Sequence, residues 1–155
     1  MKYLLLFSIY LIGTSISYRP SQAVAYARRW AYSRNPAYIG FDDPDTDESA
    51  SFISQCLIAG GFSTSDCPGN NGKYNTFSYV PNLENCLVQK GWKKSTSMPS
   101  KGMPLGSVIT FYNGGHVALV VKGGTNPLIA SHTTDVYGGS SNFGYGKKYF
   151  WTGDN

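Results

Sequence analysis

The chain contains two histidines, and each stands at one end of a segment that predicts a β-strand. His116 begins "HVALVVK" after a pair of glycines, and His132 ends "NPLIASH", the next such segment along the chain. If these strands are antiparallel neighbours, the start of the first lies beside the end of the second. Both imidazoles would then lie at one edge of the sheet. Two unrelated histidines at the edges of loops would give the same spacing.

Hydrolysis by such a pair also needs a nucleophile and hydrogen-bond donors for an oxyanion, and the N-terminus of a helix supplies the donors. The stretch "DTDESASFISQCLIAGG" predicts a helix over residues 49–59 that ends at Gly60 and Gly61. Ser49 stands at its start and is therefore the candidate nucleophile. Serine is also a preferred N-cap residue, so its position there has a purely structural explanation as well.

Segments of helical pattern precede the segments of strand pattern, which favours an α+β domain with N-terminal helices packed on a small antiparallel sheet. Proline and glycine mark the ends of three expected helices: one within residues 19–36, one over 49–59 and one over 81–90. Short runs rich in Val, Ile, Phe, Tyr and Thr predict four strands: residues 106–112, 116–122, 126–132 and 147–153.

Three cysteines remain to be placed. Cys56 lies among apolar residues of the second expected helix, as a buried small residue does. Cys67, in the loop "STSDCPGN", and Cys86, in "NLENCL", are therefore the better candidates for a disulfide, although sequence alone does not prove the pairing. No Cys-x-x-Cys or His-x-x-x-His spacing is present, so a metal site is not expected.

The first 17 residues, "MKYLLLFSIYLIGTSIS", have the pattern of a secretory signal peptide: a basic residue, an apolar run and small residues before the cleavage point. The run is shorter than a membrane span needs, although a short N-terminal anchor is an alternative. Residues 18–155 are expected to form one secreted or lumenal domain, without stable membrane association after cleavage. The formal net charge of +4 is modest, and the short basic patches "ARRW" and "GWKK" do not favour a nucleic-acid partner.

Four segments, in order, resemble the putative amidase family of the NlpC/P60 and CHAP type, which are papain-like cysteine hydrolases. They are "AYARRWAYSRNPAYIGF", "ESASFISQCLIAGG", "MPLGSVITFYNGGHVALVV" and "IASHTTD", and together they extend over most of residues 18–155. The helix is the most specific match, because the family pattern is Asp-Cys-(Ala or Thr)-Asn-Phe-(Val or Ile)-Ser-Gln. Ala50 and residues 52–55 agree with it.

The resemblance implies a papain-like fold and hydrolysis of amide bonds in bacterial cell-wall peptides without a cofactor. It assigns the general base to His116 and the orienting role to His132, with Asp135 behind it. Tyr38 matches an aromatic residue ahead of the nucleophile loop. Glu48 stands in place of the family's aspartate before the nucleophile, which is a departure from the pattern. Tyr38 and Glu48 are both candidate substrate-binding residues. A monomer that acts on a peptidoglycan-like or other peptide substrate is expected.

The chain departs from the family pattern at the nucleophile itself. Ser49 stands at the position of the catalytic cysteine, and Ser51 replaces the asparagine that follows. Cys56 lies seven residues further on, about 10 Å along a helix, and is too distant to replace the missing thiol. A serine hydroxyl is not ionised near neutral pH, so it needs a base that removes its proton during attack. A serine introduced to trap a substrate would give the same sequence.

Three hypotheses follow. The first is a secreted amidase or peptidase with Ser49 as nucleophile. The second is an inactive relative that binds cell-wall fragments or a peptide partner without cutting them. The third, a disulfide-stabilised structural protein, is disfavoured because both histidines match positions of the family pattern.

Overall fold

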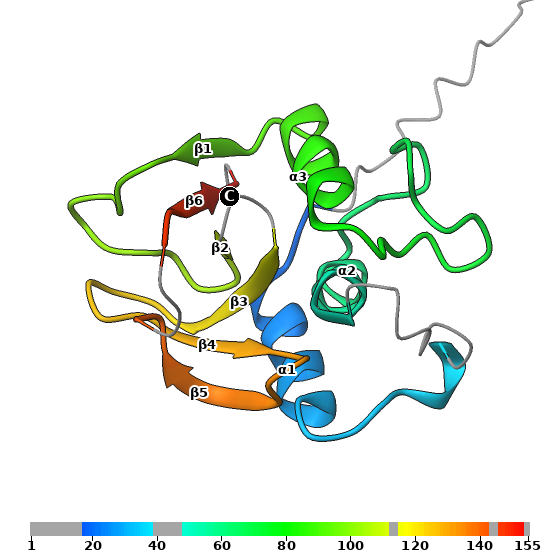
Figure 1. The fold of residues 1–155 in the computed structure, drawn as a ribbon, viewed down its shortest axis with the longest axis horizontal. Coiled ribbons are helices and arrows are strands. Elements are labelled where there is room, and N and C mark those ends of the chain that lie inside the picture. Colours follow the sequence, from blue (N-terminus) through cyan, green and yellow to red (C-terminus); the bar gives the residue numbers. More distant parts are fainter. Residues whose placement is uncertain (1–16, 39–47, 112–114, 143–145, 154–155) are drawn as a thin grey trace, which may run out of the picture.

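A computed structural model describes residues 17–38, 48–111, 115–142 and 146–153 of the 155-residue chain. The expected signal peptide therefore lies almost entirely outside the described residues. The elements appear in Figure 1 in this order: α1 (Pro20–Trp30), the 3₁₀ turn η1 (Pro36–Tyr38), α2 (Glu48–Ala59), α3 (Val80–Gln89), β1 (Lys93–Ser95), β2 (Val108–Phe111), β3 (His116–Lys122), β4 (Leu128–Ser131), β5 (Val136–Ser140) and β6 (Lys148–Thr152).

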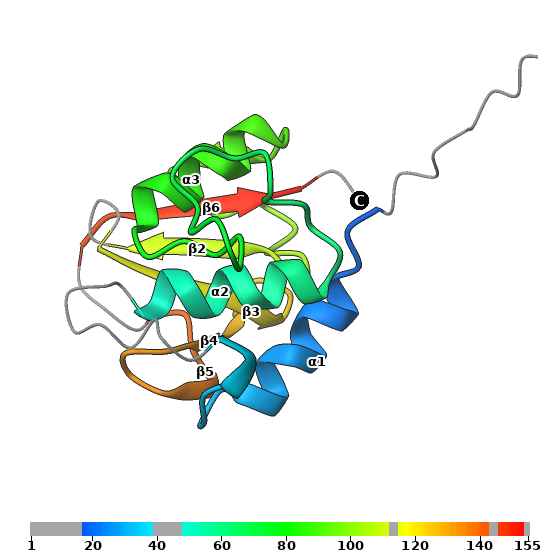
Figure 2. The same cartoon turned by 90° about the vertical axis from the view of Figure 1, so that its right-hand side faces the viewer.

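The strands form one six-stranded sheet in the order β1-β6-β2-β3-β4-β5, and every pairing is antiparallel. The three helices lie on one side of this sheet, and α2 crosses it in front of β3 (Figures 1 and 2). The predicted α+β class, with helices preceding an antiparallel sheet, is confirmed. The finer assignment of a papain-like fold remains a prediction.

The main core lies between the helices and the sheet. Helix α2 is its central element, because the side chains from Ser49 to Leu57 are all buried. Helix α1 contributes a stripe of small residues, Ala23, Ala27 and Ala31, that allows close approach of the two helices. A second, smaller cluster lies on the other face of the sheet and includes Ile109, Phe111, Ala118, Val120 and Ile129. The alternation of β3 residues between the two clusters reflects the two-residue period of a strand.

Proline and glycine set the helix ends as expected. Pro20 and Pro81 occupy the first turns of α1 and α3. A backbone N–H there has no partner within the helix, so its absence in proline costs no hydrogen bond. Gly61 and Gly91 follow α2 and α3 with positive φ, of 87° and 83°, a conformation that glycine adopts without steric cost.

Two strands and the end of α1 differ from the sequence-based prediction. Strand β1 is short and charged, and β5 contains Gly138 and Gly139, so neither has a strand pattern of its own. Their pairing partners, β6 and β4, hold them in the sheet. Helix α1 ends at Trp30, several residues before Asn35, because a turn intervenes before η1.

Cys67 and Cys86 form a disulfide, which confirms the predicted pair and joins the loop after α2 to helix α3. Cys56 is free and buried. Within the parts of the chain described above, no helix has the length and apolar composition that crossing a bilayer requires.

Candidate functional site

Ser49 lies in the first turn of α2, beside the start of β3. Its side chain is completely buried, and its hydroxyl oxygen accepts a hydrogen bond from the backbone N–H of Val117, at 3.3 Å. Val117 directly follows His116, so this contact places the hydroxyl against the first peptide of the strand that begins with the candidate base. A donated N–H stabilises an alkoxide more than the neutral alcohol, and so favours loss of the serine proton.

His116 is the first residue of β3 and is 9% exposed. It pairs across the hairpin with Phe111 of β2, and the centres of the two rings are 5.7 Å apart. Phe111 belongs to the smaller apolar cluster. By the two-residue period of the strand, the imidazole therefore lies on the face of this smaller cluster, opposite the face that α2 covers.

His132 directly follows β4 and is buried on the helix-covered side. Its ring stacks on Phe52 of α2, with centres 3.7 Å apart and planes 9° from parallel. Its Nε2 lies 2.8 Å from the carbonyl oxygen of Trp30. Because a carbonyl only accepts, Nε2 must bear the proton, and Nδ1 is then the basic nitrogen at neutral pH. Burial lowers the pKa of His132 below its ordinary value, although the Trp30 carbonyl partly opposes this shift.

The strands that bear the two histidines meet at one end of the sheet as expected, whereas a shared site of the two imidazoles remains a prediction. Strands β3 and β4 are antiparallel neighbours, and Leu119 pairs with Ala130, so the start of β3 and the end of β4 lie together. Their surroundings differ, however. The described contacts of His132 run to Trp30, Phe52 and Glu48, so its role in orienting His116 remains a prediction.

Arg34 joins the two acidic candidates. Its Nε donates to a carboxylate oxygen of Glu48, and its two terminal nitrogens donate to both carboxylate oxygens of Asp135, at 3.0 and 3.1 Å. The same Glu48 oxygen lies 3.8 Å from Nδ1 of His132. A protonated His132 would form an ion pair with Glu48 there, whereas a neutral one directs a lone pair towards it. We call Arg34, Glu48, His132 and Asp135 the charged cluster.

The remaining sequence candidates take less central positions. Tyr38 ends η1 and packs against Tyr74, with ring centres 5.6 Å apart, and burial raises the pKa of its phenol. Burial also raises the pKa of the Cys56 thiol well above its ordinary value, so this thiol stays protonated and is not a nucleophile.

A hydrogen-bonded chain that the sequence did not reveal links α1 to the first turns of α2. The Tyr26 hydroxyl donates to the side-chain oxygen of Gln55, at 2.8 Å, and the Gln55 amide donates to the Ser51 hydroxyl, at 3.2 Å. Arg34 and Tyr26 are both separated from their partners by turns and loops, so no local spacing in the sequence signals either contact.

Among the described residues, no group of three or more His, Cys, Asp or Glu side chains is arranged to hold a metal ion. The chemistry available from these residues is nucleophilic and acid–base. A hydroxyl at a helix N-terminus and an imidazole on the neighbouring strand are groups that acyl-transfer hydrolases use, although His116 lies on the sheet face opposite α2.

The comparison with known families agrees with that class. The model of the putative amidase domain family matches residues 17–152, nearly the whole described chain, and the chain belongs to this family. No curated protein and no solved structure matches it. Family membership makes the chain an amidase-like hydrolase domain. It does not by itself define the nucleophile or the substrate.

Proposed function

We propose that this protein hydrolyses amide bonds of cell-wall peptides, with Ser49 as nucleophile and His116 as general base. The observation that supports the proposal most directly is the hydrogen bond from Val117 N–H to Ser49 Oγ. It holds the hydroxyl at the start of the strand that His116 begins. For His116 to act on the same bond, its imidazole must turn from the face of Phe111 towards α2.

In the proposed reaction, Ser49 Oγ attacks the amide carbonyl carbon while His116 takes the hydroxyl proton. Backbone N–H groups of the first turn of α2 stabilise the negative oxygen of the tetrahedral intermediate. His116 then returns the proton to the leaving amine, and an acyl-serine ester remains. Water, deprotonated by the same imidazole, releases the acid and restores the serine.

The cell-wall substrate rests on the resemblance to the NlpC/P60 and CHAP type. The proposed extracellular or lumenal location is supported by the signal-peptide pattern of residues 1–17 and by the Cys67–Cys86 disulfide. Both features suit a protein that meets bacterial walls outside the cytosol. We propose that the mature domain acts as a monomer and needs no cofactor.

A second candidate, binding without cleavage, is favoured by the burial of the proposed nucleophile. The Ser49 side chain is 0% exposed, so a substrate carbonyl meets Oγ only after neighbouring atoms move. Its hydrogen bond to Val117 would also serve a purely structural serine. In that case the domain captures cell-wall fragments or a peptide in a site that lacks its thiol.

Digestion of purified peptidoglycan separates the two functions. The mature protein and its Ser49→Cys and His116→Ala variants are incubated with peptidoglycan, and the released peptides are identified by mass spectrometry. Cleavage by the unmodified chain that disappears in His116→Ala supports the serine hydrolase and identifies the bond. Cleavage by Ser49→Cys alone, with none by the unmodified chain, supports the binding function.

A further inference from the structure

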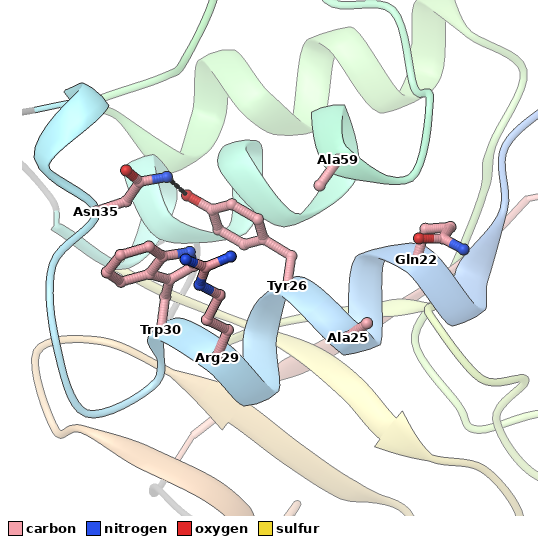
Figure 3. Close-up of a pocket in the computed structure, with 7 residues that line it drawn as sticks. All are labelled: Gln22, Ala25, Tyr26, Arg29, Trp30, Asn35 and Ala59. Carbon is pink, nitrogen blue, oxygen red and sulfur yellow. Dashed lines mark hydrogen bonds between the residues drawn. The ribbon is translucent and has the colours of Figure 1, made fainter.

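A hollow bordered by α1, the end of α2 and Asn35 is lined by none of the residues proposed for hydrolysis (Figure 3). Its volume is about 440 Å³, and the polar and aromatic side chains that line it are Gln22, Tyr26, Arg29, Trp30 and Asn35 (Figure 3). Two small residues, Ala25 of α1 and Ala59 at the end of α2, complete the lining and leave its middle open. Sites for small ligands typically have volumes of roughly 300 to 1,000 Å³, so the hollow can accept a short peptide.

Arg29 gives this hollow a positive charge that no acidic residue of the described chain neutralises. Arg34, Lys90 and Lys94 are paired with carboxylates, whereas Arg29 makes no ion pair with the residues that the structure describes. Its guanidinium instead lies over the ring of Trp30, 5.0 Å from the ring centre. This cation–π contact holds the planar group in position, and its remaining N–H groups match the two oxygens of a carboxylate.

Amide groups lie at both ends of the hollow. At one end, Asn35 donates one N–H to the Tyr26 hydroxyl, at 2.9 Å, and its oxygen accepts the backbone N–H of Ala37. An asparagine amide has two N–H groups, so one is left for a ligand. At the other end lies Gln22, whose amide can donate to or accept from a peptide group (Figure 3).

The spacing of these groups indicates the length of the ligand. Gln22 and Arg29 are seven residues apart on α1, which corresponds to about 10 Å at a rise of about 1.5 Å per residue. An extended peptide advances about 3.3 Å per residue, so about three residues extend from one group to the other.

We propose that this hollow binds a short acidic peptide of about three residues. Its carboxylate pairs with Arg29, and its backbone amides contact Asn35 and Gln22. Alanine-sized side chains fit between Ala25 and Ala59, where nothing larger lines the hollow. The proposal goes beyond the proposed hydrolysis, because binding here involves neither Ser49 nor His116.

The hollow is nevertheless connected to the candidate site. Trp30, which forms its aromatic wall, accepts the His132 hydrogen bond on its carbonyl oxygen. Tyr26 extends through Gln55 to Ser51 in the first turns of α2. The hollow and the charged cluster therefore share Trp30, and Tyr26 links the hollow through Gln55 to the first turn of α2.

Tryptophan fluorescence provides the test, since Trp92 and Trp151 are buried and Trp30 is the most accessible of the three tryptophans. The protein is titrated with acetyl-Ala-Ala-Glu-amide and acetyl-Glu-Ala-Ala-amide, because either chain direction is compatible with the hollow. Each is matched by its glutamine counterpart. Arg29→Ala is compared with Arg28→Ala, which makes the same change in net charge on the same helix. Arg28 donates to Tyr137, on the other side of α1.

We expect a glutamate peptide to quench the fluorescence saturably. Its affinity should be about ten-fold higher than that of its glutamine counterpart, and about ten-fold lower in Arg29→Ala. Arg28→Ala should change the affinity less than about two-fold. Equal losses in the two arginine variants, equal affinity for the glutamate and glutamine peptides, or no saturation below about 10 mM would each overturn the proposal. Because no bond is cut in this assay, a failed digestion of peptidoglycan leaves its outcome unaffected.

Discussion

The first turn and the later turns of helix α2 both contribute buried side chains, but they are held by different forces. The first turn is fixed by polar contacts: Glu48 with Arg34, and Ser49 with the backbone of Val117. The later turns are fixed by packing, since Phe52, Ile53, Cys56 and Leu57 are fully buried in the main core. The apolar turns should therefore determine the free energy of unfolding, and the polar turn should determine reactivity with a smaller effect on stability.

The largest expected effect separates two buried serines of this one helix. If the proposed hydrolysis is correct, Ser49→Ala should lower the rate of amide hydrolysis at least about 1,000-fold. Ser54 is the matched control, because it is equally buried but accepts the backbone N–H of Phe77 and donates to the Ala50 carbonyl. Ser54→Ala should cost about 1 to 2 kcal/mol of stability and retain the activity. Equal loss of hydrolysis in Ser49→Ala and Ser54→Ala would contradict a catalytic role that is specific to Ser49.

The packed turns are tested by Leu57→Ala. Leu57 is completely buried in the main core, so we expect the free energy of unfolding in urea to fall by about 3 kcal/mol. Val88→Ala in α3, where the side chain is 59% exposed, should cost less than about 0.5 kcal/mol. A loss at Leu57 no greater than that at Val88 would show that the packing of α2 does not determine stability.

The charged cluster is tested by Arg34→Ala, which leaves Glu48 and Asp135 without their shared cation. About one third of each of these side chains is exposed, so solvent screens the ion pairs, and we expect a loss of about 1 kcal/mol that decreases at high salt. Lys90→Ala, which breaks the Lys90–Asp66 pair with its more exposed carboxylate, serves as a control with a smaller loss. A loss for Arg34→Ala that is independent of salt would argue for packing rather than charge.

The smallest expected effect concerns the pH dependence of His132. Its folded pKa lies below the ordinary value of 6.5, because burial disfavours the imidazolium. Below about pH 6.5 the unfolded chain therefore binds a proton that the folded chain does not, and stability should decrease as the pH falls towards the folded pKa. Above that range both states are neutral and the contribution is constant.

Comparison with His132→Gln isolates this contribution. The difference in unfolding free energy between the two proteins should shrink as the pH is lowered from 7 to 5, measured in urea at each pH. A difference that grows on acidification would mean that Glu48 stabilises the imidazolium and raises the His132 pKa instead.

The elements of the core could be predicted because their evidence is local. The apolar residues of α2 and the glycines after it, and the β-branched run of β3, specify their structure within a few neighbouring residues. Strands β1 and β5 could not be predicted, since "KKS" and "VYGGS" become strands only beside β6 and β4. Their conformation is a property of the partner and not of the segment.

The same distinction applies to the candidate site. The meeting of β3 and β4 at one end of the sheet followed from the geometry of an antiparallel hairpin, whereas the two histidine side chains lie on different faces there. The role of Arg34 did not, because its two partners lie 14 and 101 residues away along the chain. The hydrogen bond between His132 and the Trp30 carbonyl could not be predicted either, because every residue has a backbone carbonyl and the sequence does not indicate which one is used.

The position of β6 has a consequence for the order of folding. It is the last strand of the described chain, yet it lies between β1 and β2 in the sheet. During synthesis β1 therefore leaves the ribosome long before β6, its partner among the described strands, and β2 exposes an unpaired edge until Lys148–Thr152 follow. The complete sheet cannot form while the polypeptide is still growing through this region, so removal of these five residues would leave β1 unpaired and give β2 a permanent open edge.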